Sequence, residues 1–376
     1  MPTSEPRADD SGLALGLIAH ARYSCRHSGV CCSSDWEIPV ENALHTRLAR
    51  AIDDGELRPR GGIGLVDRAN LPAGTRSVLG RRSGRCVFHT AGPCGCGLHA
   101  WGGADAKPVA CRQFPWIAVH DPRGTFASLS HVCPAAQDRL GDPALLVLAP
   151  LPRAAVSFDG LDVRRSLPPA LSMRRLLDWD ALSAWETQAL DACARNDAPE
   201  GVLLDLLALL THARLWTAAQ GPLAAWIGSW TPDELPSPAA AWRPDPALDA
   251  IVRASAPVGL AVPSPIACDE ARHGREGWRG GAPLIRRYLA ARLIACWPLH
   301  YGTGLATEIA YGAALLSVLA VEMTRRTPAE DSTGAGDAAV LAAIAETDRL
   351  VVHLAAPDAL ARGLDAWAVR HLDGGL

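Results

Sequence analysis

Residues 25–32 read CRHSGVCC, residues 86–99 read CVFHTAGPCGCGLH and residues 107–116 read KPVACRQFPW. With Cys133, these segments hold eight of the 11 cysteines of the 376-residue chain. Cysteines gathered on short loops rich in glycine and proline are typical of a disulfide framework, a zinc site or an iron–sulfur cluster. The stretch therefore predicts a small, irregular cysteine-rich domain, around which the rest of the chain forms a helical body.

Composition and charge limit the classes of protein to which this chain can belong. A chain that is 49% hydrophobic can bury a large core, and a net charge of −4 argues against a surface for nucleic acid. The N-terminus is polar and acidic, unlike a secretory signal. The longest apolar run, Ile309 to Val321, has 13 residues, against about 20 for a membrane span. We therefore expect a soluble cytoplasmic protein without membrane contact. Because the cytosol keeps thiols reduced, this location disfavours disulfides.

The pattern along the chain predicts a mainly α protein with a small irregular α+β cysteine-rich domain and a helical-bundle body. We expect a disordered tail over residues 1–12, the cysteine domain over 13–140 and the α-helical domain over 141–376. A stretch rich in proline and tryptophan, residues 221–263, is predicted to be an irregular excursion within the helical domain.

Hydrophobic spacing locates the individual elements. Leu44, Leu48 and Ile52 recur every four residues and predict a helix over 41–53. Alternation predicts a hairpin of residues 117–119 and 126–129. Helices are expected over 171–194, 202–215, 283–297, 305–324, 337–354 and 357–371, of which 305–324 is apolar nearly all round and should be the buried central helix.

Some polar residues and cysteines of the helical part receive predictions of their own. Arg286, Arg287 and Arg292 should face solvent, and Glu308 in the apolar helix should form an ion pair with an arginine near the helix end. The isolated Cys193, Cys268 and Cys296 are interpreted as small buried hydrophobic residues.

The clustered cysteines can converge on a metal. Capture of a metal needs several thiolates from different loops, with backbone N–H groups free to bond their sulfurs. Gly29, Gly92, Gly95 and Gly97 allow the necessary turns. The adjacent Cys31 and Cys32 tend to point apart, so one can bind a metal while the other binds a second metal or supports the first. Six to eight cysteines also exceed the four that one zinc or one cubane cluster requires.

Histidines beside the cysteines leave a mixed Cys/His zinc site open. These are His27, His89, His99 and His131. A histidine in such a place is more often a hydrogen-bond partner of loop backbone.

The order of motifs resembles that of the CxxCxxCC cysteine-cluster family of zinc- or iron-chelating proteins over about residues 22–138. CRHSGVCC stands for the first block, CVFHTAGPCGCGLH for the second and KPVACRQFPW for the third, before a later Cys-Pro. Ser28 stands where the pattern often has its second cysteine, which leaves that block one ligand short or leaves Ser28 or His27 to serve. Cys94 is additional to the pattern. The resemblance implies as metal ligands Cys25, Cys31, Cys32, Cys86, Cys96, Cys111 and Cys133.

The C-terminal half resembles the flagellin lysine-N-methylase group. The segments are LSMRRLLDWDALSAWE from residue 171, LIRRYLAARLIACWPLHYGTG from residue 284 and IAETDRLVVHL from residue 344. This resemblance implies an iron–sulfur cluster, 4Fe–4S rather than zinc, and S-adenosylmethionine-dependent methyl transfer to a protein substrate. The alternatives are a non-catalytic module that chelates zinc and a metal storage or delivery protein. No catalytic residue is assigned.

Overall fold

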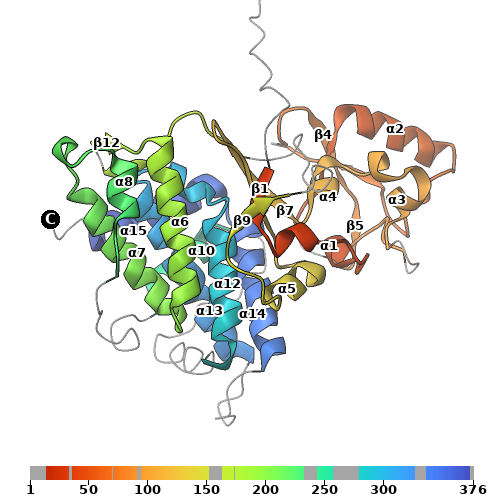
Figure 1. The fold of residues 1–376 in the computed structure, drawn as a ribbon. Coiled ribbons are helices and arrows are strands. Elements are labelled where there is room, and N and C mark those ends of the chain that lie inside the picture. Colours follow the sequence, from red (N-terminus) through yellow and green to blue (C-terminus); the bar gives the residue numbers. More distant parts are fainter. Residues whose placement is uncertain are drawn as a thin grey trace, which may run out of the picture.

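The fold is a small cysteine-bearing lobe and a helical body joined across a central sheet (Figure 1). The computed structural model describes residues 14–33, 36–69, 71–90, 95–151, 163–172, 174–232, 244–256, 279–326 and 336–372. The predicted tail, Cys94 and Cys268 lie outside these residues. Helices predominate and strands are confined to small sheets, which confirms the predicted fold class.

The small lobe is built on a three-stranded antiparallel sheet covered by one long helix. The strand order is β2 (Pro39–Glu41), β4 (Thr75–Leu79) and β3 (Leu65–Asp67), and α2 (Asn42–Asp53) follows β2 directly. Leu44 and Leu48 on α2 are buried against this sheet, as their spacing predicted. The lobe is completed by the hairpin β5 (Arg81–Arg82) and β6 (Arg85–Cys86) and by the short helices α1 (Val30–Ser33), α3 (Gly97–Gly102) and α4 (Val109–Gln113).

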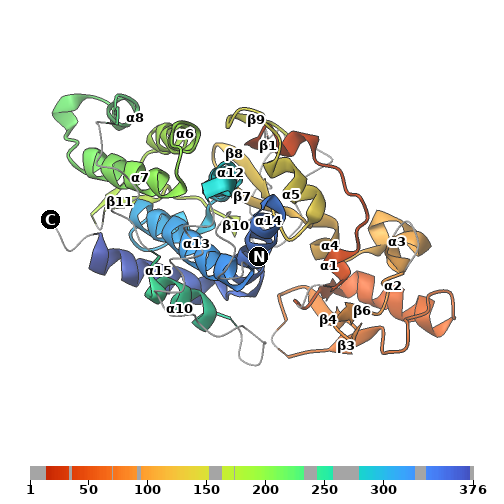
Figure 2. The ribbon, with the colours of Figure 1, turned by 90° about the horizontal axis from the view of Figure 1, so that it is seen from below.

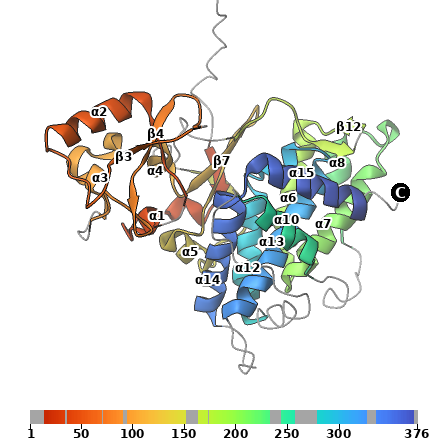
Figure 3. The same cartoon turned by 180° about the vertical axis from the view of Figure 1, so that it is seen from behind.

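A five-stranded sheet stands between the lobe and the body (Figures 1 and 3). Its strand order is β10-β7-β8-β1-β9. The predicted hairpin is present as β7 (Trp116–Asp121) and β8 (Gly124–Leu129), and α5 (Pro134–Leu140) follows it. Residues beyond 140 also join this sheet. The other strands are β1 (Ala14–Leu17), β9 (Leu148–Pro150) and β10 (Val163–Arg164).

The helical body surrounds α13 (Leu305–Arg326), which is buried on all sides over most of its length (Figure 2). This confirms the predicted central helix. By length and composition α13 could also cross a membrane, but its most apolar stretch is wholly inside the protein, as a core helix would be. The helices in contact with it are α7 (Pro199–Arg214), α10 (Pro246–Ala254), α12 (Ala282–Leu293), α14 (Asp337–Asp348) and α15 (Pro357–His371).

The predicted ranges 171–194 and 221–263 need correction. The range 171–194 begins as the hairpin β11 (Ala170–Ser172) and β12 (Arg175–Leu176), and α6 starts only at Trp179 (Trp179–Arg195). The carboxylate of Asp178 accepts the N–H of Ala181 at 2.6 Å and so begins that helix. The range 221–263 is not irregular throughout, since it contains α8 (Leu223–Gly228) and α10.

Two polar residues and one helix of the body differ from the prediction. Arg292 is not on a solvated face but only 4% exposed. Among the residues that the structure describes, no arginine forms an ion pair with Glu308; its side-chain oxygen accepts the indole N–H of Trp185 at 2.6 Å. The expected helix 337–354 changes at residue 349 into a π-helix, Arg349–Leu354.

The 3₁₀ turns are His20–Arg22, Ala104–Ala106, Ala218–Gln220, Arg279–Gly281 and Trp297–His300.

Candidate metal centre

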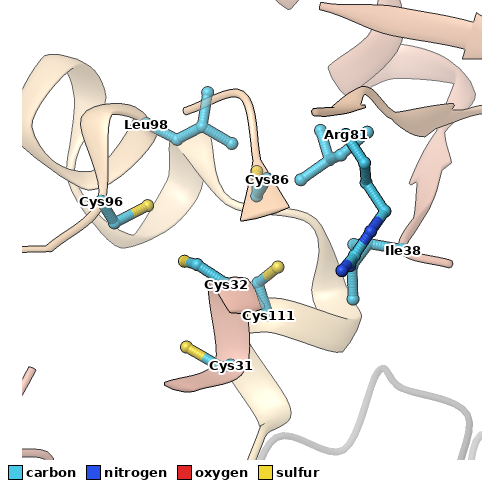
Figure 4. A pocket seen from close by; sticks show the side chains of 9 residues that line it. Cys31, Cys32, Ile38, Arg81, Cys86, Cys96, Leu98 and Cys111 are labelled. Carbon is cyan, nitrogen blue, oxygen red and sulfur yellow. The ribbon is translucent and has the colours of Figure 1, made fainter. Parts of the chain in front are cut away.

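Five of the seven predicted ligands line one pocket in the small lobe (Figure 4). They come from four separate segments: α1, the end of β6, the residue before α3, and α4. Apolar side chains and the guanidinium-bearing Arg81 complete the wall. The five are Cys31, Cys32, Cys86, Cys96 and Cys111.

Glycines bring these segments close together. Gly29 has φ of +73°, and a Cβ there would lie 2.7 Å from Nε2 of His89. Gly95 has φ of +58°, and a Cβ there would lie 3.1 Å from the carbonyl oxygen of His27. A side chain at either position would therefore separate α1 from the segments that carry Cys86 and Cys96.

Hydrogen bonds among the thiols set their acidity. The bond with Cys32 lowers the pKa of Cys31 to about 7 and that of Cys96 to about 6. The same two bonds raise the pKa of Cys32, and burial raises the pKa of Cys86 and of Cys111. At neutral pH two of the five groups are thus readily deprotonated, which is the form that binds metal.

Positive charge and backbone N–H groups also face the sulfurs. Lys107, the single lysine of the chain, helps to lower the pKa of Cys31 and of Cys96 and partly offsets the effect of burial on Cys111. The backbone N–H groups of Leu98 and His99, at the start of α3, help to lower the pKa of Cys96. N–H groups directed toward sulfur stabilise sulfur ligands in metal sites.

The remaining two predicted ligands lie elsewhere, at Tyr23. The phenol oxygen of Tyr23 is 3.8 Å from Sγ of Cys133 and also hydrogen-bonds to Cys25. Burial and the two thiols raise the pKa of Tyr23 above its ordinary range. The structure therefore divides the predicted set into a group of five and a pair, whereas Ser28 is exposed and lines no wall of the pocket.

The four histidines do not line the pocket of the described cysteines. His89 packs on Gly29, and the rings of His27 and His99 lie 6.0 Å apart. His131 is fully buried at the boundary of sheet and body, where its backbone N–H donates to Oδ2 of Asp348 at 2.6 Å.

Sequence reasoning missed a buried polar cluster around Asp348. The hydroxyl of Tyr288 donates to Oδ1 of Asp348 at 2.8 Å, and Nη1 of Arg292 lies 3.8 Å from the same oxygen. Arg292 also donates to Ser128 at 2.9 Å and to the Leu129 carbonyl. The cluster ties β8 to α12 and α14. The local pattern does not single out Arg292 or Asp348, because α12 and α14 each carry other charged residues.

A second missed contact ties the small lobe to the body. The ring of Trp36, which follows the Cys31-Cys32 pair, stacks on the ring of His353 in the π-helix. Nε2 of His353 is 2.6 Å from the hydroxyl oxygen of Ser130, and Phe114 packs beside both rings. Segments next to Cys32, Cys111 and Cys133 thus meet at one histidine of the helical body.

The donor set of the pocket suits a soft metal or an iron–sulfur cluster, because thiolates, an apolar wall and N–H groups toward sulfur are present together. The side chains are not arranged around a single ion: in the described parts of the chain, no three Cys, His, Asp or Glu groups take up that geometry. The five thiols share a pocket and partly share protons. The pocket therefore suits a metal in the type of its donor groups and in their closeness to one another.

Comparisons with protein-family models, with curated proteins and with solved structures yield no match for this chain. The resemblance to the cysteine-cluster family and to the lysine-N-methylase group therefore rests on the quoted motifs alone and stays a prediction.

Proposed function

We propose that the five-thiol pocket is a metal centre that holds an iron–sulfur cluster of the 4Fe–4S type. The observation that carries the proposal is that cysteines from four segments converge on one apolar pocket. The first and last of them, Cys31 and Cys111, are 80 residues apart in the sequence. Four thiolates complete the ligand set of a cubane cluster, so the pocket has one thiol in excess.

Of the adjacent cysteines Cys31 and Cys32, one is the thiol in excess. Cys32 hydrogen-bonds to Cys31 and to Cys96, and these bonds hold its own proton most firmly. Cys31, Cys86, Cys96 and Cys111 each come from a different position around the pocket (Figure 4). Substitution of each cysteine in turn decides whether Cys32 binds the metal itself or supports its neighbours.

Beyond metal binding, we propose that the chain is a cytoplasmic S-adenosylmethionine-dependent transferase that methylates lysine on a protein substrate. The support is the motif order of the resemblance together with the helical body on which the metal lobe is mounted. The metal would supply a redox-active or structural centre, and the chain's own contribution would be the contact of Trp36 and His353 that fixes the lobe on the body.

A zinc-chelating binding module is the second candidate, because four thiolates also satisfy structural zinc. One experiment separates the two. The full chain is purified without oxygen, and its metal content is measured beside its visible spectrum. Iron with acid-labile sulfide and a brown colour supports the cluster, whereas stoichiometric zinc in a colourless protein supports the module. Neither metal, with free thiols, would contradict both.

The control for that measurement is a cysteine outside the pocket. Cys193 is buried in α6 and contributes no wall to the pocket, so Cys193→Ala should keep the metal, whereas Cys96→Ser should lose it. With the cluster established, transfer of a labelled methyl group from S-adenosylmethionine to lysine residues of a protein tests the activity.

A further inference from the structure

A second cavity lies in the helical body, away from the five-thiol pocket. Its volume is about 320 Å³, near the lower end of the range for small-molecule sites. Its walls come from the segment between β10 and β11, from β12 and from the turn that precedes α13. The residues with polar side chains in this wall are Arg165, Ser166, His300 and Tyr301.

The wall of this cavity is held in place by the turn before α13. Gly304 has φ of +63°, and a Cβ there would lie 2.1 Å from the carbonyl oxygen of Ala170. Oδ1 of Asp365 accepts the N–H of Thr303 at 2.6 Å and the hydroxyl of Thr307 at 3.1 Å. The cavity is therefore a built feature of the fold, and the carboxylate of Asp365 is engaged in building it.

Arg165 brings an uncompensated positive charge to the cavity. Its guanidinium lies over the ring of Tyr301, 4.7 Å from the centroid. Within the described parts of the chain, no carboxylate pairs with Arg165, and its buried Nε has no hydrogen-bond partner. The nearby acids are occupied: Asp358 accepts the hydroxyl of Tyr301 at 3.3 Å, and Asp121 pairs with Arg123 at 2.7 Å.

His300 adds a neutral polar group beside this charge. Burial and the charge of Arg165 lower the pKa of His300 to about 4, so its ring is uncharged at pH 7. Its buried Nδ1 has no partner among the described residues. The buried Nε of Arg165 is costly to leave without a partner unless a ligand satisfies it.

The rim of the cavity is apolar. Leu167 is 68% exposed and Leu176 is 54% exposed, and both line the cavity. Large aliphatic side chains so open to water gain free energy when a ligand covers them. The cavity therefore offers one cation together with exposed aliphatic surface.

We propose that this cavity binds a small organic carboxylate, whose charged group pairs with Arg165 while its aliphatic part packs on Leu167 and Leu176. A planar guanidinium matches the two oxygens of a carboxylate. The single charge and the aliphatic rim favour this class over a multiply charged phosphate.

The test uses the full chain with 4-methylpentanoate as the probe, titrated at pH 7 by ligand-detected NMR. We expect saturable binding, with the neutral 4-methylpentanamide and inorganic phosphate each weaker by about tenfold or more. Arg165→Gln should weaken the acid by about the same factor. Arg175→Gln is the matched control, because Arg175 lies over the ring of Trp216 outside the cavity and should leave the affinity unchanged.

Each other result overturns the proposal. Equal binding of acid and amide would remove the role of the charge, and phosphate binding as tight as that of the acid would mean an anion site without aliphatic recognition. Absence of saturation at millimolar acid would remove the site. If Arg165→Gln does not fold, Leu176→Glu replaces it: this exposed position tolerates the change, and the new carboxylate should repel the acid but not the amide.

Discussion

Trp36 and His353 are stacked, with ring centroids 4.2 Å apart and planes inclined by 20°. Trp36 belongs to the segment of the small lobe that follows Cys32, and His353 belongs to the π-helix of the body. The two rings are separated by more than 300 residues of chain, yet they form a direct contact between lobe and body. The stability of the lobe on the body should therefore depend on this pair.

Trp36→Ala should lower the free energy of unfolding by about 2–3 kcal/mol, because it removes both the stack and its buried apolar area. Trp36→Phe keeps an aromatic face and should lose about half of that. Urea unfolding followed by circular dichroism gives both values. Equal stability of the alanine variant and the unmodified chain would show that the stack contributes nothing.

Asp348→Asn should destabilise the fold by about 3–5 kcal/mol, because it leaves the buried guanidinium of Arg292 without its counter-charge. Asp105→Asn is the control: its carboxylate is 88% exposed and 3.9 Å from Arg112, so its loss should be nearly neutral. Denaturant melts at pH 7 compare the two. A loss of the same size in both would contradict the role given to the Asp348 cluster.

The carboxylate of Asp348 should also make the protein less stable at low pH. Burial by itself would raise the pKa of Asp348. The charge of Arg292 and the bonds to His131 nevertheless hold this pKa well below its ordinary value of 3.8. A carboxyl whose pKa is depressed by folding stabilises the protein above the unfolded pKa, and this contribution is lost as pH falls below it. Stability should therefore decrease below about pH 4, and the Asn variant should lack this part of the decrease.

Glu308 should make the protein less stable as the pH rises. Burial raises the pKa of Glu308 to about 8 from 4.5, so folding favours its protonated form. Stability from this group is complete below pH 4.5 and is lost progressively as pH rises toward 8, by about 1.4 kcal/mol per unit. Glu308→Gln keeps an acceptor for Trp185 and should remove the trend.

Melts of Glu308→Gln and of the unmodified chain between pH 5 and about pH 8 measure this. The variant should gain relative stability at each step upward, whereas Glu56→Gln, at an exposed position, should run parallel to the unmodified chain. A constant difference for Glu308→Gln across the range would show that the acid titrates normally.

Lys107 should control the reactivity of the metal-free thiols. Its positive charge helps to lower the pKa of Cys31 and of Cys96. Lys107→Ala should raise both and slow alkylation by iodoacetamide at pH 7 severalfold, because the thiolate is the nucleophile. Lys107→Arg keeps the charge and should restore the rate. Equal rates in all three proteins would remove Lys107 from the site.

Cys32→Ala should keep its metal, because Cys32 holds its proton most firmly, while in the metal-free protein the pKa of Cys31 and that of Cys96 rise toward the ordinary thiol value. If Cys32 is itself a ligand, the variant instead loses metal and thermal stability together, since metal binding is coupled to folding. Metal analysis, a thermal melt and alkylation rates of the metal-free variant distinguish these results. Unchanged metal content together with unchanged alkylation rates would exclude Cys32 from the site.

Local pattern predicted much of the helical framework. The range 357–371 is a helix with the predicted bounds, because proline begins it and apolar residues repeat with the helical period. Alternation likewise predicted the β7–β8 hairpin. These features depend on neighbours a few residues apart, and their physical causes are present in the sequence itself.

The candidate site was predicted only as a set of residues. Spacing and motif order marked seven cysteines, but the division into a group of five and the pair at Tyr23 depends on distances across the fold. Arg292 was predicted to face solvent because its helix otherwise has a polar side, and only the approach of Asp348 from α14 makes its burial tolerable. The sequence by itself determined which groups could take part. The tertiary structure decided which of them meet, because the energy of a buried charge or thiol depends on partners that the chain brings from far away.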